Sequence, residues 1–311
     1  MREYLRRFRR ALVVACALIP MVSVPLLFTQ RLALAQVSPS GVDPKLLAKA
    51  EAGDAEAEVK LGLLYCDGDG VPQDYAKAAA WFQKSGDQGN AQAQFNLGEL
   101  YNDGKGVKQD YAQAAAWFLK AAQKGHFPAE FSLGELYYNG QGVKQDYAQA
   151  AAWYRKAADQ DDDDAEFKLG LLYYDGQGVK QDYAQAAFWF RQAAEQGDAS
   201  SQLNLGQLYQ RGQGVKQDYV QAAAWYRKSA EHGDPEAQAL LGALYYSGRG
   251  VPQNYAEAYF WLSLAAPEIK GPGQDAAAKG RDVAASKLTP DALSKARERA
   301  SKWSAWHRSP P

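Results

Sequence analysis

One phrase returns every 36 residues along most of this chain, and it restricts the possible folds more than any other feature. In its third copy it reads Asn139-Gly140-Gln141-Gly142-Val143-Lys144-Gln145-Asp146-Tyr147. A period of about 20–50 residues is typical of repeat arrays, in which each unit packs only on its neighbours. We therefore expect an elongated array in place of one or two globular domains. The valine of the phrase stands at Val71, Val107, Val143, Val179, Val215 and Val251.

Each unit has the pattern of two helices. In the first unit we expect one helix over about residues 55–66 and another over 75–86, because apolar residues recur with helical spacing. Asp54 precedes the first helix and Asp74 the second, and both can cap an N-terminus. Three residues after Asp74 stands Lys77, and the other units have Gln or Glu there, which predicts a capping box. Glycine ends the first helix, where a left-handed residue is needed.

A glycine also lies inside every first helix. Glycine weakens a helix by about 1 kcal/mol relative to alanine, so its return in all six units needs a reason. We expect an aromatic ring of a neighbouring helix to lie against it. The tryptophans of the second helices fall within the apolar pattern, so we interpret them as packing residues and not as platforms for sugars. The glycines are Gly62, Gly98, Gly134, Gly170, Gly206 and Gly242, and the tryptophans are Trp81, Trp117, Trp153, Trp189, Trp225 and Trp261.

The units resemble the Sel-one-like repeat family, a longer relative of the tetratricopeptide repeat. The fourth copy carries the hallmarks: residues 165–173 read Ala-Glu-Phe-Lys-Leu-Gly-Leu-Leu-Tyr, residues 176–179 read Gly-Gln-Gly-Val, and Asp182-Tyr183, Ala186 and Trp189 follow. The resemblance covers six copies, over residues 54–266. It implies an all-α fold, a right-handed α-solenoid of antiparallel helix pairs, and work as an adaptor or scaffold and not catalysis.

The two ends of the chain differ from the repeats. We expect a linker and capping helix over residues 36–53, two capping helices over 267–306 and a disordered tail over 307–311. The first 35 residues have the pattern of a secretory signal, because five arginines precede an apolar run from Ala11 to Phe28 and Ala33-Leu34-Ala35 follows. We predict cleavage after Ala35 and a periplasmic or secreted protein. The alternative is an inner-membrane anchor, since 18 apolar residues are just enough to span a bilayer.

The net charge argues against a nucleic-acid partner, and the cysteine content argues against an internal disulfide. Residues 1–35 hold six arginines and one glutamate, so the remaining chain has 29 basic and 35 acidic residues, a net charge of −6. Nucleic-acid binding needs a basic surface, so we expect no nucleic-acid partner. Cleavage would leave Cys66 as the single cysteine, so no internal disulfide can form.

Three patterns that could indicate a cofactor or metal have a simpler interpretation. The glycine-rich loops lack the spacing of a phosphate-binding loop. The acidic run over residues 159–164 lacks the glycine and the final glutamate of a calcium loop, and acidic side chains are favoured at a helix start in any case. His126, His232 and His307 lie in different units without ligand spacing. We therefore expect no cofactor, no metal site and no catalytic residue.

The candidate binding surface is a stripe on the first helices, away from their apolar faces. It holds the residues equivalent to 56, 60, 63 and 67, which vary most among otherwise similar copies. Eight acids against three bases give it a charge of −5. In related helical solenoids the first helices line the concave face, which is where a partner segment would bind. The alternative is a solvated surface whose residues vary freely. The candidate partner-binding residues are Lys60, Asn96, Glu99, Asp103, Ser132, Glu135, Lys168, Asn204, Gln207 and Arg211.

These observations predict an exported, monomeric, non-catalytic scaffold that binds a protein or peptide segment, with a membrane involved only if the N-terminal segment stays attached. The alternative is a binder of a cell-envelope ligand or a β-lactam hydrolase, because some cysteine-rich members of the family are associated with β-lactams. This chain lacks their paired cysteines. Glycan binding would need rows of exposed aromatic rings, and the tryptophans here are expected to be buried.

Overall fold

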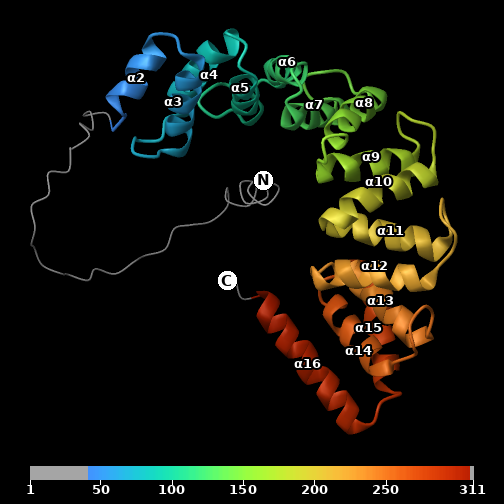
Figure 1. Cartoon of the computed structure of the whole chain (residues 1–311). Coiled ribbons are helices and arrows are strands. Elements are labelled where there is room, and N and C mark those ends of the chain that lie inside the picture. Colours follow the sequence, from blue (N-terminus) through green and yellow to red (C-terminus); the bar gives the residue numbers. More distant parts are fainter. Residues whose placement is uncertain (1–40, 309–311) are drawn as a thin grey trace, which may run out of the picture.

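The computed structural model describes residues 41–308, and within that range the chain forms fifteen helices and no strand. It is an all-α solenoid, as predicted. Figure 1 shows the helices stacked side by side along a curve, with α5 and α7 toward its inner side. The apolar run at the N-terminus, and with it the expected signal or anchor, lies outside the described residues. Between residues 41 and 308 no helix has both the length and the apolar content needed to cross a membrane.

Six antiparallel helix pairs make up the array. We call the first helix of each pair the A helix and the second the B helix. Each B helix packs on its own A helix, and the first five also pack on the A helix of the next pair, so the four inner units are held by a repeat on each side. The A helices are α3 (Ala55–Asp67), α5 (Ala91–Asp103), α7 (Phe127–Asn139), α9 (Asp163–Asp175), α11 (Ala199–Arg211) and α13 (Pro235–Ser247). The B helices are α4 (Tyr75–Asp87), α6 (Tyr111–Ala122), α8 (Tyr147–Ala158), α10 (Tyr183–Gln196), α12 (Tyr219–Glu231) and α14 (Tyr255–Ala265).

The predicted caps set the helix ends. Asp54 accepts a hydrogen bond from the backbone N–H of Ala57 at 2.9 Å, and Gly68 ends the same helix in the left-handed region at φ 72°. His126 departs from the pattern, since it stands at the N-cap position of α7 without a capping bond from its side chain. Asp161 takes the left-handed conformation that glycine has at the equivalent place in other units, with φ 63°.

The capping box of the B helices is only half formed. Asp110 accepts from the backbone N–H groups of Ala112 and Gln113, as expected of an N-cap. Its own backbone N–H, however, donates to the carbonyl oxygen of Tyr101 at 2.9 Å. That bond ties the B helix to the preceding A helix, so the reciprocal bond of a capping box is not the one that forms.

The repeated phrase is a structural loop. In the third unit the side-chain amide of Gln145 donates to the carbonyl oxygen of Tyr138 at 2.9 Å and to the hydroxyl of Tyr147 at 3.1 Å. The second glycine of the loop packs on the previous B helix, where a Cβ added to Gly142 would stand 2.2 Å from the backbone of Tyr111. The phrase therefore sets the geometry between units and is not itself a binding motif.

The prediction for the glycine inside each A helix is confirmed in five units. A Cβ at Gly170 would stand 2.6 Å from the ring of Phe190, and the first, second, third and fifth units show the same contact with a phenylalanine or tyrosine. The sixth unit differs, because Gly242 faces Leu262 and not a ring. The tryptophans follow the packing prediction in part: Trp117, Trp189 and Trp261 are buried, whereas Trp81, Trp153 and Trp225 are half-buried.

Helices of another kind close the two ends of the array. The N-terminal helix α2 (Pro44–Glu51) covers α3, and Val42 is buried just before it. At the other end, α15 (Pro272–Ala285) lies within the expected capping region and packs on α14. The last helix, α16 (Pro290–Arg308), also packs on α14, and Figure 1 shows it leaving the line of the other helices. The tail was expected over residues 307–311, but residues 307 and 308 belong to α16, and the remaining three lie outside the described residues.

Candidate functional site

The candidate stripe lies along the six A helices. Its members are not equally accessible. The exposed ones are Lys60, Asp103 and Arg211, and the half-buried ones are Asn96, Glu99, Ser132, Glu135, Lys168, Asn204 and Gln207. The structure thus places the ten predicted residues on five successive A helices, from α3 to α11, with most of them half-buried.

Several of these side chains bind one another between units. Glu135 forms an ion pair of 2.8 Å with Lys168 of the next unit and accepts a hydrogen bond from the hydroxyl of Tyr154. A guanidinium nitrogen of Arg211 donates to the hydroxyl of Tyr174 at 2.9 Å. In its centre, the stripe is therefore part of the packing between units. The sequence pattern did not reveal this role.

Glu99 is the carboxyl group of the stripe with the most perturbed acidity. Burial raises its pKa to about 7, and the neighbouring carboxylate of Asp103 adds to the increase. Lys105 and a hydrogen bond with Ser132 act in the opposite direction. Lys105 itself is paired with Asp103 at 2.9 Å. A cation brought near Glu99 by a partner would favour its ionised form.

A row of buried polar side chains inside the A helices escaped the sequence interpretation. Glu166, 1 % exposed, accepts a hydrogen bond of 2.9 Å from Gln196, and burial raises its pKa to about 7. Where the unit has glutamine, as at Gln202, the side chain donates to the backbone carbonyl of Ala194 at 3.1 Å. The return of Glu or Gln at one position in every unit was a signal visible in the sequence. The buried members are Glu58, Gln94, Glu130, Glu166, Gln202 and Gln238.

The stripe ends in an apolar cavity of about 510 Å³ in the sixth unit. One wall is the stripe face of α13, and the facing wall is the capping helix α15. Sequence reasoning did not predict this cavity because the opposite wall comes from outside the repeats. The lining residues are Glu236, Ala239, Leu240, Ala243, Tyr246, Leu262, Ile269, Gly273, Ala276, Ala277 and Gly280.

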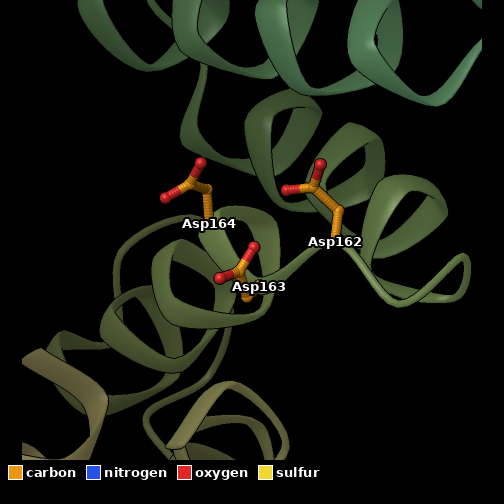
Figure 2. Close-up of side chains that lie close together, drawn as sticks. All are labelled: Asp162, Asp163 and Asp164. Atoms are coloured by element: carbon orange, nitrogen blue, oxygen red, sulfur yellow. The ribbon is translucent and has the colours of Figure 1, made fainter. Parts of the chain in front are cut away.

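The last three residues of the acidic run over 159–164 stand at a helix start, as predicted, whereas Asp159 caps the end of α8 and Asp161 lies in the turn between the helices. Figure 2 shows Asp162, Asp163 and Asp164 together at the start of α9, with side-chain oxygens within 4.8 Å of one another. Asp162 is the N-cap and accepts a hydrogen bond of 2.9 Å from the backbone N–H of Ala165. Three consecutive acids at a helix start are favoured by the helix dipole, and this capping role accounts for the cluster.

Cys66 and a hollow in the fourth unit both lack the features of a functional site. The thiol of Cys66 is half-buried, and burial raises its pKa to about 11, which disfavours the nucleophilic thiolate. A hollow of about 740 Å³ in the fourth unit is lined by the loop phrase, including Val179, Gln181 and Asp182. Those residue types occupy the same positions in the other loops, so the hollow follows from the repeat geometry.

Comparison with known proteins agrees with this architecture. The Sel1 repeat model matches residues 55–90, 91–126, 128–162, 163–198, 199–234 and 235–266. The crystal structure of a Sel1 repeat protein from Oxalobacter formigenes is similar at 34 % identity, over 72 % of this chain and 92 % of that one, with a TM-score of 0.65. A protective antigen of uropathogenic Escherichia coli, which displays the same repeat fold, is similar at 26 % identity over 83 % and 85 % of the two chains, with a TM-score of 0.37. No protein of curated function matches the sequence.

Proposed function

This chain belongs to the Sel1-repeat family, and from that premise we propose that its A-helix stripe holds an extended segment of a partner protein. Proteins of Sel1 repeats generally mediate protein–protein interaction and are mostly non-enzymatic. The observation that carries the proposal is the charge of the stripe, −5, within a chain whose net charge is −1. A segment rich in lysine or arginine is the matching partner.

The carboxyl groups of the stripe differ in their partners, because Glu135 pairs with a lysine of another unit, whereas Asp103 is exposed and pairs with Lys105 of its own unit. Glu135 is already paired with Lys168, and it joins two units. Glu99 and Asp103 lie one helical turn apart on α5, and the negative charge of Asp103 contributes to the raised pKa of Glu99. We therefore assign the main contact with a basic segment to Glu99 and Asp103, and a mainly structural role to Glu135.

Replacing the carboxylates of Glu99 and Asp103 by amides of similar shape tests this assignment. Peptides of about 12 residues, long enough to span several repeats when extended, are selected from a displayed random library on the purified full chain. We expect the selected peptides to be basic. Their affinity, measured by calorimetry, should fall about tenfold in the variant Glu99→Gln/Asp103→Asn, because two attractive charges are lost.

The matched control removes the same charge elsewhere. Glu195 and Glu231 are exposed acids near the ends of two B helices, outside the stripe. The variant Glu195→Gln/Glu231→Gln should bind the peptides as the unchanged protein does. Equal affinity of both double variants, or selected peptides without excess basic residues, would refute the stripe as the binding surface.

Export to the periplasm or beyond is a separate part of the proposal. It is supported by the arginines, the apolar run and Ala33-Leu34-Ala35 in the sequence. Expression of the full chain in a bacterium, followed by N-terminal sequencing of the envelope fraction, should give a first residue of Gln36. A chain that keeps its first 35 residues in the membrane fraction would favour the anchor instead.

A further inference from the structure

The sixth unit lacks a pair of rings that three other units have. In the second, third and fourth units, a phenylalanine of the A helix packs against a ring of the B helix, with centroids 5.8 Å apart for Phe95–Phe118, 5.7 Å for Phe131–Tyr154 and 6.0 Å for Phe167–Phe190. The equivalent residues of the sixth unit are Ala239 and Leu262. Both ring positions are thus occupied by smaller side chains, and the cavity of about 510 Å³ lies there.

The facing helix keeps this space open. The residues of α15 that line the cavity are Gly273, Ala276, Ala277 and Gly280, which share one side of the helix at helical spacing. None has a side chain longer than a methyl group. A Cβ added at Gly280 would stand 3.3 Å from Leu262, so any longer side chain there would project into the cavity. Small residues on one wall and the missing ring on the other make one continuous apolar space.

We propose that this cavity binds the apolar anchor of the partner segment, one aromatic or large aliphatic side chain with the backbone beside it. The proposal rests on the proposed function, because the cavity opens on the stripe through Glu236, Leu240 and Ala243. Its walls are apolar, with Leu240, Leu262 and Ile269 among them, and it stands where rings are packed in other units. A phenylalanine or leucine from the partner restores that packing.

Charge favours a basic peptide over other apolar occupants. Glu236 lies at the cavity and is held by a hydrogen bond of 2.8 Å from Gln207 of the previous unit. A lysine or arginine next to the anchor would meet this carboxylate and the acidic stripe beyond it. A fatty acid would bring a carboxylate to the same place. A second copy of the chain would add like charge, because the chain without its first 35 residues has a net charge of −6.

Two variants fill the cavity from opposite walls. Ala239→Phe introduces the side chain that the second, third and fourth units have at this position, so it is compatible with the repeat. Gly280→Leu fills the space from α15 and replaces a glycine within a helix by a good helix former. The control is Ala224→Phe on the exposed side of α12, where the fourth unit has the exposed Phe188. Circular dichroism confirms that each variant is folded.

The probes are the selected basic peptides and their derivatives with each large apolar residue changed to alanine. We expect one such residue to be the anchor, with affinity about tenfold or more lower in its alanine derivative. Ala239→Phe and Gly280→Leu should weaken the parent peptide by a similar factor and leave the alanine derivative unchanged. Ala224→Phe should bind both peptides normally.

The outcomes separate this proposal from the proposed function. If filling the cavity leaves the parent affinity unchanged while Glu99→Gln/Asp103→Asn lowers it, the anchor is refuted and the acidic stripe stands. If the charge variant has no effect but the filled variants do, the stripe is refuted and the cavity stands. Sedimentation of the unchanged protein as a dimer that Ala239→Phe converts to a monomer would show that a second copy occupies the cavity. If dodecanoate displaces the peptide and binds more tightly than the peptide does, the cavity is a site for an acyl chain. Either of these last two results, the dimer or the acyl chain, would overturn the proposal.

Discussion

The packing of repeats raises the pKa of single carboxyl groups in this protein above their usual range. Glu166 is buried within α9, and burial raises its pKa from 4.5 to about 7. The folded protein therefore holds a proton that the unfolded chain releases between these two values. Its contribution to stability is fully present below pH 4.5 and is lost as the pH rises through 7.

Glu166→Gln tests this effect with a side chain that the second, fifth and sixth units use at the same position. At pH 8 the free energy of unfolding should increase by about 2 kcal/mol, because the buried negative charge is gone. Near pH 4 the increase should vanish, since Glu166 is then neutral in both states. Urea unfolding at the two pH values measures the difference, and Glu195→Gln serves as the exposed control. An increase of the same size at both pH values would contradict the explanation.

Glu99 couples acidity to binding. Its pKa of about 7 means that Glu99 of the free protein is partly protonated near neutrality, and a bound cation would favour the ionised form. The affinity for a basic peptide should therefore rise between pH 6 and pH 8. In Glu99→Gln the affinity should be nearly constant over this range. A rise that persists in the variant would mean that another group titrates.

At the scale of the helix, close approach outweighs helix propensity. The glycine within each A helix lies so near the facing side chain that a methyl group does not fit, with 2.6 Å between an added Cβ of Gly170 and the ring of Phe190. The aromatic ring thereby packs directly on the A-helix backbone. The two helices of a unit are held at this close spacing.

Gly170→Ala should lower the free energy of unfolding by about 1–3 kcal/mol, because the added methyl forces the helices apart. Helix propensity alone predicts a gain of up to about 1 kcal/mol, so the sign decides between the two effects. Gly280→Ala is the contrast, since its Cβ would meet only the flexible end of Leu262 at 3.3 Å. Denaturant unfolding of both variants gives the comparison. A stabilised Gly170→Ala would show that the ring can move.

At the scale of the whole molecule, the junctions between units differ. Arginine from one B helix donates to a tyrosine hydroxyl of the next A helix in three junctions, namely Arg155–Tyr173 at 2.9 Å, Arg191–Tyr209 at 2.6 Å and Arg227–Tyr245. The equivalent residues of the first two units are Gln83 and Leu119. Units of a solenoid are stabilised mainly by their neighbours, so unequal junctions imply unequal local stability.

We expect the amides of α3–α6 to exchange hydrogen faster than those of α9–α12. Hydrogen exchange with mass spectrometry resolves these helices, and Arg191→Leu, which copies the second unit, should accelerate exchange in its two neighbouring units. Protection that is uniform along the array, or unaffected by Arg191→Leu, would show that the arginine bonds add little to the junctions.

The 36-residue repeat explains which features of the fold could be predicted from the sequence. The order of the helices, the Asp and Asn caps, the left-handed glycines and the glycine under Phe190 are local or nearest-neighbour features, so every copy repeats them. The capping-box prediction was half wrong, because the N–H of Asp110 meets Tyr101, which is adjacent only after the helices pair. The buried position of Glu166 was missed for the same reason, since its partner Gln196 lies 30 residues further along the chain.

The repeating unit, the all-α solenoid and the family could be predicted from the sequence, because these rest on interactions within one unit and between adjacent units. Which of the variable stripe residues are paired or buried depends on the folded arrangement. The structure showed Glu135 bound to Lys168, Glu99 with its pKa near neutrality, and the cavity beside Ala239. Those features arise where non-identical side chains meet, and the cavity also needs α15, a helix outside the repeats. A periodic pattern describes the average unit, whereas specificity comes from the places where units depart from it.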